Sequence, residues 1–114
     1  MKIPFLENIV IDDSKLTDYL LNIYHSDGNK KAKFLIERKF DANSLKTILV
    51  KQAEEEYVKE VKYSEFGTKY IIESNVKSPD NRAFTLRSVW IVYLNEKFIK
   101  LVTAYPIKHY DKRI

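Results

Sequence analysis

The residues best suited to chemistry lie in one short stretch, residues 25–34, where His25 and Gly28 precede a run that contains Lys31 and Lys33. A histidine changes its protonation state near neutral pH, so it can donate or accept a proton. Lysines at the start of a helix offer positive charge and hydrogen-bond donors to a phosphate or a carboxylate. A solvated loop followed by a basic helix start is the alternative interpretation of the same stretch.

A second group of candidates falls on two strand-like segments of the second half. Side chains alternate between the two faces of a strand, so the pattern over residues 83–94 places Arg87 opposite a face that we expect to be core. That core face consists of Phe84, Leu86, Ser88, Trp90 and Val92. On the last strand, the same alternation predicts that Thr103 and Tyr105 share a face with Ile99 and Leu101. A guanidinium in the middle of a strand must be solvated, paired with a structural carboxylate, or matched with an anion from a ligand.

These residue types fit metal-independent RNA cleavage by the 2′-hydroxyl. That reaction needs a group that transfers a proton and donors that stabilise a dianionic phosphorane. We predict His25 as the acid or base, Lys31 and Arg87 as phosphorane-stabilising cations, and Thr103 and Tyr105 as the residues that position the scissile phosphate. The predicted substrate-binding residues are Gly28, Lys33, Lys69 and Tyr70.

Other chemistries fit the sequence poorly. The chain has no cysteine, which excludes disulfides, zinc–thiolate sites and a cysteine nucleophile. Its two histidines have no carboxylates at ligand spacing, so we predict no metal site and no cofactor. Phosphate-binding glycine loops and a nucleophile-elbow serine are absent from the sequence. The acidic run at residues 54–56 is typical of a solvated helix end.

Composition favours a folded chain with an anionic partner. The 114 residues fit a single domain, with a helical part at about 12–56, a sheet part at about 57–106 and a basic tail at 107–114. The net charge of +4 favours RNA or an acidic protein as partner. Neither a signal-peptide pattern nor an apolar run long enough for a membrane span occurs in the sequence, so we expect a cytoplasmic protein without membrane contact.

Hydrophobic periodicity predicts about three helices in the first half. The first begins at Asp13 or Ser14 and ends near Tyr24, with Leu16, Tyr19, Leu20, Ile23 and Tyr24 on its buried face. The second runs from about Asn29 to Lys39. The third is capped by Asp41 or Asn43 and buries Leu45, Ile48, Leu49 and Ala53.

β-Branched and aromatic residues then predict about four strands, at residues 57–66, 68–76, 83–94 and 97–105, with turns at Gly67, residues 78–81 and residues 95–96. Short connections between consecutive strands indicate an antiparallel meander. The predicted fold class is therefore α+β, with about three N-terminal helices packed on one face of a C-terminal antiparallel sheet of about four strands.

Several motifs together resemble a family of small bacterial proteins of uncharacterised function. They are residues 1–4, residues 15–22, His25 with Gly28, residues 31–34, residues 67–70, residues 87–91 and residues 101–106, so the resemblance covers nearly the whole chain. The proline that usually follows the histidine is Ser26 here. Related domains look like the C-terminal tips of polymorphic and phage-head-associated toxins, similar to the barnase, EndoU, colicin and RelE group of metal-independent ribonucleases. The resemblance implies RNA cleavage by a toxin, on the analogy of fold.

Two functions therefore stay open at the level of sequence. The first is a metal-independent RNA endonuclease, a toxin whose activity requires an acidic antitoxin or immunity protein that covers the basic site. The second is a noncatalytic basic module that binds nucleic acid or an acidic protein through the exposed sheet face. A third reading, a structural or regulatory partner protein, needs no chemistry at all.

Overall fold

A five-stranded mixed sheet dominates the computed structural model, which describes residues 1–24 and 29–107. The strand order is β1-β5-β4-β3-β2. Strands β2 to β5 form an antiparallel meander, and β1 pairs with β5 in parallel. The elements are η1 (Leu6–Asn8), β1 (Ile9–Val10), η2 (Lys15–Leu20), α1 (Asn29–Glu37), α2 (Ala42–Glu55), β2 (Glu60–Ser64), β3 (Gly67–Lys77), β4 (Ala83–Tyr93) and β5 (Ile99–Ile107).

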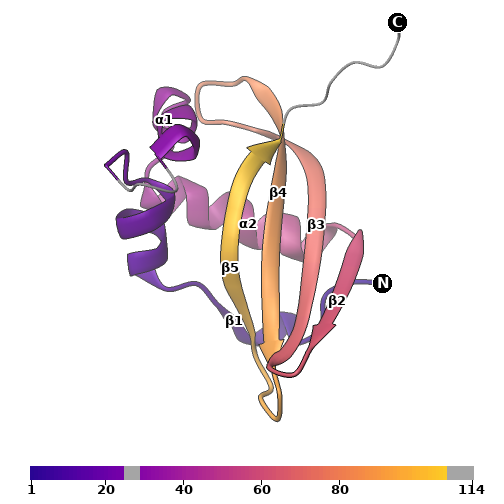
Figure 1. Cartoon of the computed structure of the whole chain (residues 1–114). Coiled ribbons are helices and arrows are strands. Elements are labelled where there is room, and N and C mark those ends of the chain that lie inside the picture. The colour runs from indigo at the N-terminus through magenta and orange to yellow at the C-terminus, as the bar shows by residue number, and fades with distance from the viewer. Residues whose placement is uncertain (25–28, 108–114) are drawn as a thin grey trace, which may run out of the picture.

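The predicted arrangement of three helices on one face of a four-stranded sheet is wrong. Only α1 and α2 reach seven residues within the described ranges, and only α2 crosses the sheet, whereas α1 and η2 lie beside the β5 edge (Figure 1). The fifth strand, β1, was not predicted. It is two residues long, too short to show any periodicity, and its position depends on pairing with a segment about ninety residues away in the sequence.

Helix α2 forms where the sequence places it. Asp41 accepts a hydrogen bond from the Ser44 backbone N–H at 2.8 Å, and the Ser44 hydroxyl accepts one from the Asp41 N–H at 2.9 Å, which makes a capping box. The helix then packs Leu45, Leu49 and Ala53 into the core. These contacts fix α2 behind the sheet in Figure 1, so the opposite face of β3, β4 and β5 is free of helices in that view.

The core also contains a polar network. The Gln52 amide donates to the Ser74 hydroxyl at 2.8 Å and to the Leu86 carbonyl at 2.9 Å. Its oxygen accepts from the Ser88 hydroxyl at 2.6 Å, and the Trp90 indole N–H donates to Ser88 at 2.9 Å. The predicted core face of β4 is therefore the face that α2 covers, and its polar members are satisfied there.

The first predicted helix is shorter than expected and is a π-helix. Leu21 N–H donates to the Leu16 carbonyl, five residues earlier, and the helix ends at Leu20. Ile23 is 42% exposed and Tyr24 is 89% exposed, so neither belongs to the buried face that was predicted for them.

Helix α1 begins at Asn29 as predicted and ends two residues early, at Glu37. Lys39 adopts a left-handed backbone conformation with φ 72°, and Phe40 N–H donates to the Leu35 carbonyl at 3.1 Å. This is a helix stop of the Schellman type in which lysine takes the position that glycine usually fills. The stop turns Phe40 into the core, where it contacts Phe84 edge to face.

A β-bulge between β4 and β5 changes which residues share a face. Ser88 pairs with Ala104 and Trp90 pairs with Leu101, so β5 contains one residue more than β4 between these two pairs. Leu101 and Ala104 are both buried, and Thr103 and Tyr105 therefore lie on the opposite face from Ile99 and Leu101. The predicted common face of these four residues is wrong, because simple alternation cannot reveal the inserted residue.

Candidate active site on the sheet face opposite the long helix

Three chemically active side chains lie in one row across the centre of the sheet. Glu73 on β3 pairs in register with Arg87 on β4, and Arg87 pairs with Tyr105 on β5. All three project from the face opposite α2, because Ser74, Leu86 and Ala104, one residue away on each strand, lie on the face that α2 covers. The bulge is what places Tyr105 in this row.

Arg87 connects the other two side chains. Its Nε donates to Glu73 Oε2 at 2.5 Å, and its Nη2 forms an ion pair with the same carboxylate oxygen. Its Nη1 donates to the Tyr105 hydroxyl at 3.1 Å. The guanidinium is therefore held in one plane between a carboxylate and a phenol, and the phenol keeps its own proton available for another acceptor.

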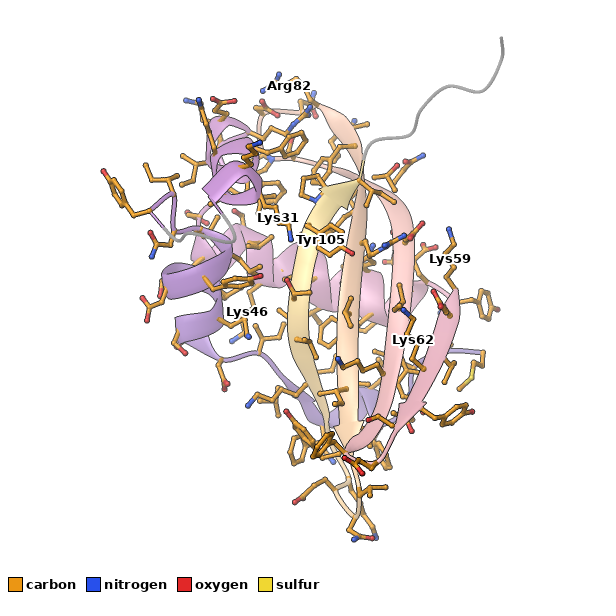
Figure 2. All side chains as sticks on the ribbon, in the orientation of Figure 1. Lys31, Lys46, Lys59, Lys62, Arg82 and Tyr105 are labelled. Carbon is orange, nitrogen blue, oxygen red and sulfur yellow. The ribbon has the colours of Figure 1, made fainter. Side chains whose placement is uncertain are left out.

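Two lysines reach the row from either end. Lys59, in the segment before β2, pairs its Nζ with Glu73 Oε1 at 2.7 Å. Lys31, from α1, places its Nζ 4.4 Å from the centre of the Tyr105 ring. In Figure 2, Lys31 points toward Tyr105 from the β5 edge of the sheet, and Lys59 lies near the opposite edge, beside β2. We call Lys31, Lys59, Glu73, Arg87 and Tyr105 the sheet-face cluster.

The cluster holds an excess of positive charge around one shielded carboxylate. The Glu73 side chain is 8% exposed, and that burial raises its pKa, but the hydrogen bonds from Lys59 and Arg87 outweigh burial and lower the pKa overall. The Tyr105 hydroxyl and Glu73 together raise the pKa of Arg87. The cluster contains three cations and one anion, so it has a formal charge of +2, which favours an incoming phosphate.

Thr103 lies beside the row on the same face of β5. It pairs in register with Val89, two residues from the pairing of Arg87 with Tyr105. Its hydroxyl oxygen is shielded from solvent and has no hydrogen-bond partner among the described residues. A shielded hydroxyl with an unused donor is able to serve a ligand atom placed next to it.

The remaining predicted site residues have different positions. His25 and Gly28 lie outside the described residues. Lys33 is exposed on α1, and Lys69 is exposed on β3 on the same face as Glu73. Tyr70 lies on the face that α2 covers, opposite the buried Trp90, and is packed against the core, where burial raises the pKa of its phenol. The structure therefore brings Lys31, Arg87, Thr103 and Tyr105 together, but Tyr70 does not join them.

Sequence reasoning missed Glu73 and Lys59. Glu73 carried a signal, since alternation along β3 puts it on the same face as Lys69 and Ile71. The turn predicted at residues 78–81 would pair Arg87 with Ile72, whereas the loop in the structure spans residues 78–82 and pairs Arg87 with Glu73. No sequence signal indicated Lys59, because this residue precedes β2 and contacts Glu73 only through the pairing of β2 with β3.

The cluster combines the functions that acid–base catalysis on a phosphodiester requires. A carboxylate accepts a proton, a phenol donates one, and guanidinium and ammonium groups stabilise negative charge. Among the described residues, no group of three or more histidine, aspartate or glutamate side chains is arranged to hold a metal ion. In the same ranges, the helices are all too short or too polar to cross a membrane.

A model of a protein family, described as a domain of unknown function (DUF6883), matches residues 2–108. The chain belongs to the DUF6883 family. Comparison of this DUF6883 protein with curated proteins gave no match.

The fold of the DUF6883 chain is also found in a solved structure. A chain in a contact-dependent growth inhibition toxin–immunity protein complex from Klebsiella pneumoniae 342 aligns with a TM-score of 0.72 and 17% sequence identity. The alignment covers 92% of the DUF6883 chain and 98% of the Klebsiella chain. At this identity, the similarity establishes a shared fold.

Proposed function

We propose that this DUF6883 protein is a metal-independent RNA endonuclease and that it acts as a toxin. One observation carries the proposal: a carboxylate and a phenol, Glu73 and Tyr105, flank Arg87 in a single row on the sheet face opposite α2. A base, an acid and a cation between them match the groups that 2′-hydroxyl attack on a phosphodiester requires.

In the proposed reaction, Glu73 is the general base. The carboxylate is ionised at neutral pH and accepts the proton of the ribose 2′-hydroxyl, although the contacts with Lys59 and Arg87 that lower its pKa make it a weaker base. The 2′-oxygen then forms a bond to phosphorus, and the bond from phosphorus to the 5′-oxygen breaks. Tyr105 gives its proton to the departing 5′-oxygen, so the products are a 2′,3′-cyclic phosphate and a 5′-hydroxyl end.

The cations of the sheet-face cluster stabilise the phosphorane and the phenolate. Arg87 contacts both Glu73 and Tyr105, so it lies between the site of attack and the leaving group. Lys31 lies over the Tyr105 ring and Lys59 lies against Glu73. Thr103 positions the phosphate through its unused hydroxyl. The role predicted for His25 as acid or base stays a prediction, because that residue lies outside the described ranges.

A toxic nuclease requires a partner that protects the producing cell. The similarity in fold to a chain of a toxin–immunity protein complex supports the proposal that this protein acts together with such a partner. We propose an acidic immunity protein or antitoxin that covers the sheet-face cluster, since complementary charge accelerates association with a positively charged site.

A noncatalytic RNA-binding module is the second candidate, and a specific observation favours it. Glu73 neutralises Arg87 directly, as a structural ion pair would. The same face also carries a hollow of about 460 Å³ lined by Tyr63, Phe66 and Tyr93 together with Lys62 and Lys69. Exposed aromatic rings next to lysines can stack single-stranded bases without cutting the strand.

Incubation of the purified protein with RNA in EDTA separates the two candidates. We expect cleavage by the unmodified protein and a loss of about 100-fold or more in Arg87→Gln and Tyr105→Phe. The matched control is Lys46→Gln, which changes an exposed lysine of α2 that lies to the left of β5 in Figure 2 and is outside the sheet-face cluster. RNA binding without products in the unmodified protein would support the binding module, and equal cleavage by all variants would place the active site elsewhere.

A further inference from the structure

A second hollow of about 440 Å³ adjoins the sheet-face cluster, between α1 and the adjacent ends of β4 and β5. Lys31 lines this hollow and also lies over the Tyr105 ring, and Pro106, directly after Tyr105, forms part of its wall. The volume falls within the range of small-molecule sites, about 300–1,000 Å³. A ligand bound at the cluster therefore has room to extend into the hollow.

The hollow offers aromatic surface and a stacked guanidinium. Phe34 and Phe84 meet edge to face, with ring centres 5.3 Å apart. The Arg38 guanidinium carbon lies 4.3 Å from the centre of the Phe34 ring and 5.4 Å from that of Phe84. All three residues line the hollow. Flat rings and a flat cation are the surfaces on which a nucleobase stacks.

Arg38 also has an unused donor. Its Nη1 atom is shielded from solvent and has no hydrogen-bond partner among the described residues. A shielded N–H without an acceptor is unfavourable, and the free energy is recovered when a ligand supplies the acceptor. Lys30 and Lys31 add further donors to the lining, which includes no carboxylate side chain from residues 1–24 and 29–107.

We propose that this hollow is a nucleobase subsite that selects a keto base, guanine or uracil. The proposal rests on the proposed function, because it places the base of a nucleotide whose phosphate lies at the sheet-face cluster. Guanine presents O6 and N7, and uracil presents O4 and O2, all of which accept hydrogen bonds from Arg38 and the lysines. Adenine has an amino group in place of O6 of guanine, and cytosine has one in place of O4 of uracil, so these amino groups would face a lining rich in donors.

Binding of the four ribonucleoside 3′-monophosphates tests the proposal without requiring turnover. Titrations are followed by backbone amide chemical shifts, with dissociation constants for each nucleotide. We expect the guanosine and uridine nucleotides to bind about tenfold more tightly than the adenosine and cytidine nucleotides. In Arg38→Gln the ratio should fall to about one, and in Phe34→Leu all four affinities should fall about tenfold with the ratio retained. The matched control is Arg82→Gln, at an exposed arginine that does not line the hollow.

Four results would overturn the proposal: equal affinities in the unmodified protein, a preference for adenosine or cytidine, no binding at millimolar concentration, or a base preference that survives Arg38→Gln. The test is independent of the proposed nuclease activity. A protein that does not cut RNA can still show the keto preference, and a protein that cuts RNA at all four bases alike would refute the subsite alone.

Discussion

Glu73 and Arg87 are direct partners across the antiparallel pair of β3 and β4, and each also has a second polar partner on the same face. Glu73 contacts Lys59, and Arg87 contacts Tyr105. An isolated structural ion pair needs neither extra contact, since one guanidinium already balances one carboxylate. The additional lysines leave the row with surplus positive charge, which is what distinguishes an anion site from a neutral ion pair.

The first prediction is that Glu73→Gln changes RNA cleavage and RNA binding in opposite directions. Cleavage should fall by about 100- to 10,000-fold, because the general base is lost. RNA affinity should rise at low salt, because the change removes a negative charge from a cationic surface. Cleavage rates in EDTA and filter binding over a salt series measure both quantities, with Lys46→Gln as the control. A variant that cuts RNA at the unmodified rate would remove Glu73 from the reaction.

The second prediction concerns Lys31, whose ammonium lies over the Tyr105 ring. Lys31→Met should lower kcat/KM on a short RNA by about 10- to 100-fold, since a cation near the leaving group is lost. Lys46→Met is the matched control, at an exposed lysine on α2 outside the sheet-face cluster. Equal losses in both variants would indicate a general charge effect and would contradict a specific role for Lys31.

The third prediction is a dependence of stability on pH that originates at Glu73. The pKa of this carboxyl is lower in the folded protein than its ordinary value of 4.5, so the unfolded chain binds more protons in the acid range. The pairing with Arg87 and Lys59 therefore stabilises the fold above about pH 4.5 and is lost as the pH falls through the lowered pKa. Urea unfolding at pH 7, 5, 4 and 3 should show a smaller acid loss in Glu73→Gln than in the unmodified protein. Asp41 and Asp80, whose carboxyl pKa values are also lowered, are present in both proteins, so their contributions cancel in the comparison. An equal loss of stability with falling pH in the two proteins would contradict the assignment of this dependence to Glu73.

The sequence predicts the parts of this fold that depend on local patterns. Helix α2 follows from the capping residue Asp41 and its apolar spacing, and the core face of β4 follows from alternation. The bulge opposite Val89 and Trp90 could not be predicted, because residues 101–104 show no polar–apolar pattern that marks the change in alternation. The bulge determines the composition of the site, because without the inserted residue Tyr105 would lie on the face that α2 covers.

Lys59 could not be predicted from the sequence, because it reaches Glu73 only through the pairing of β2 with β3. Lys31 and Tyr105 were predicted for one site, and they meet because α1 lies beside β5. The stop of the π-helix at Leu20 was also missed, since Ile23 and Tyr24 continue the apolar pattern of a helix that has already ended. Periodicity reports which residues are apolar, whereas the chain direction after Leu20 depends on local hydrogen bonds such as the one from Tyr24 N–H to the Asn22 side chain.

The fourth prediction concerns Gly67, at the turn into β3. Its φ of 154° is one that residues with a side chain rarely adopt, and a Cβ there would lie 2.2 Å from the Val92 carbonyl oxygen. Gly67→Ala should therefore destabilise the protein by about 2–4 kcal/mol. Thermal unfolding measures the change, and Lys69→Ala, at an exposed position on the same strand, should change stability by less than about 0.5 kcal/mol. An unchanged melting temperature in Gly67→Ala would contradict the close backbone approach.

The fifth prediction concerns the buried amide of Gln52. Gln52→Leu keeps the size of the side chain but leaves the Leu86 carbonyl and the Ser88 hydroxyl without a partner that each now has. The expected loss of stability is about 1–3 kcal/mol. The control is Lys51→Ala, exposed on the same helix, and urea unfolding compares the two variants. A Gln52→Leu protein as stable as the unmodified one would show that the network has no net effect on stability.

The most direct test of the proposed reaction is the cleavage of a short RNA in EDTA, compared with the same oligonucleotide carrying a single 2′-deoxyribose at the cleaved position. Mass spectrometry identifies the new ends. Attack by the 2′-hydroxyl predicts a 2′,3′-cyclic phosphate and a 5′-hydroxyl from the RNA, and no cleavage at the deoxyribose. Cutting at the deoxyribose at the same rate, or products that carry a 5′-phosphate, would contradict a reaction in which Glu73 deprotonates the 2′-hydroxyl.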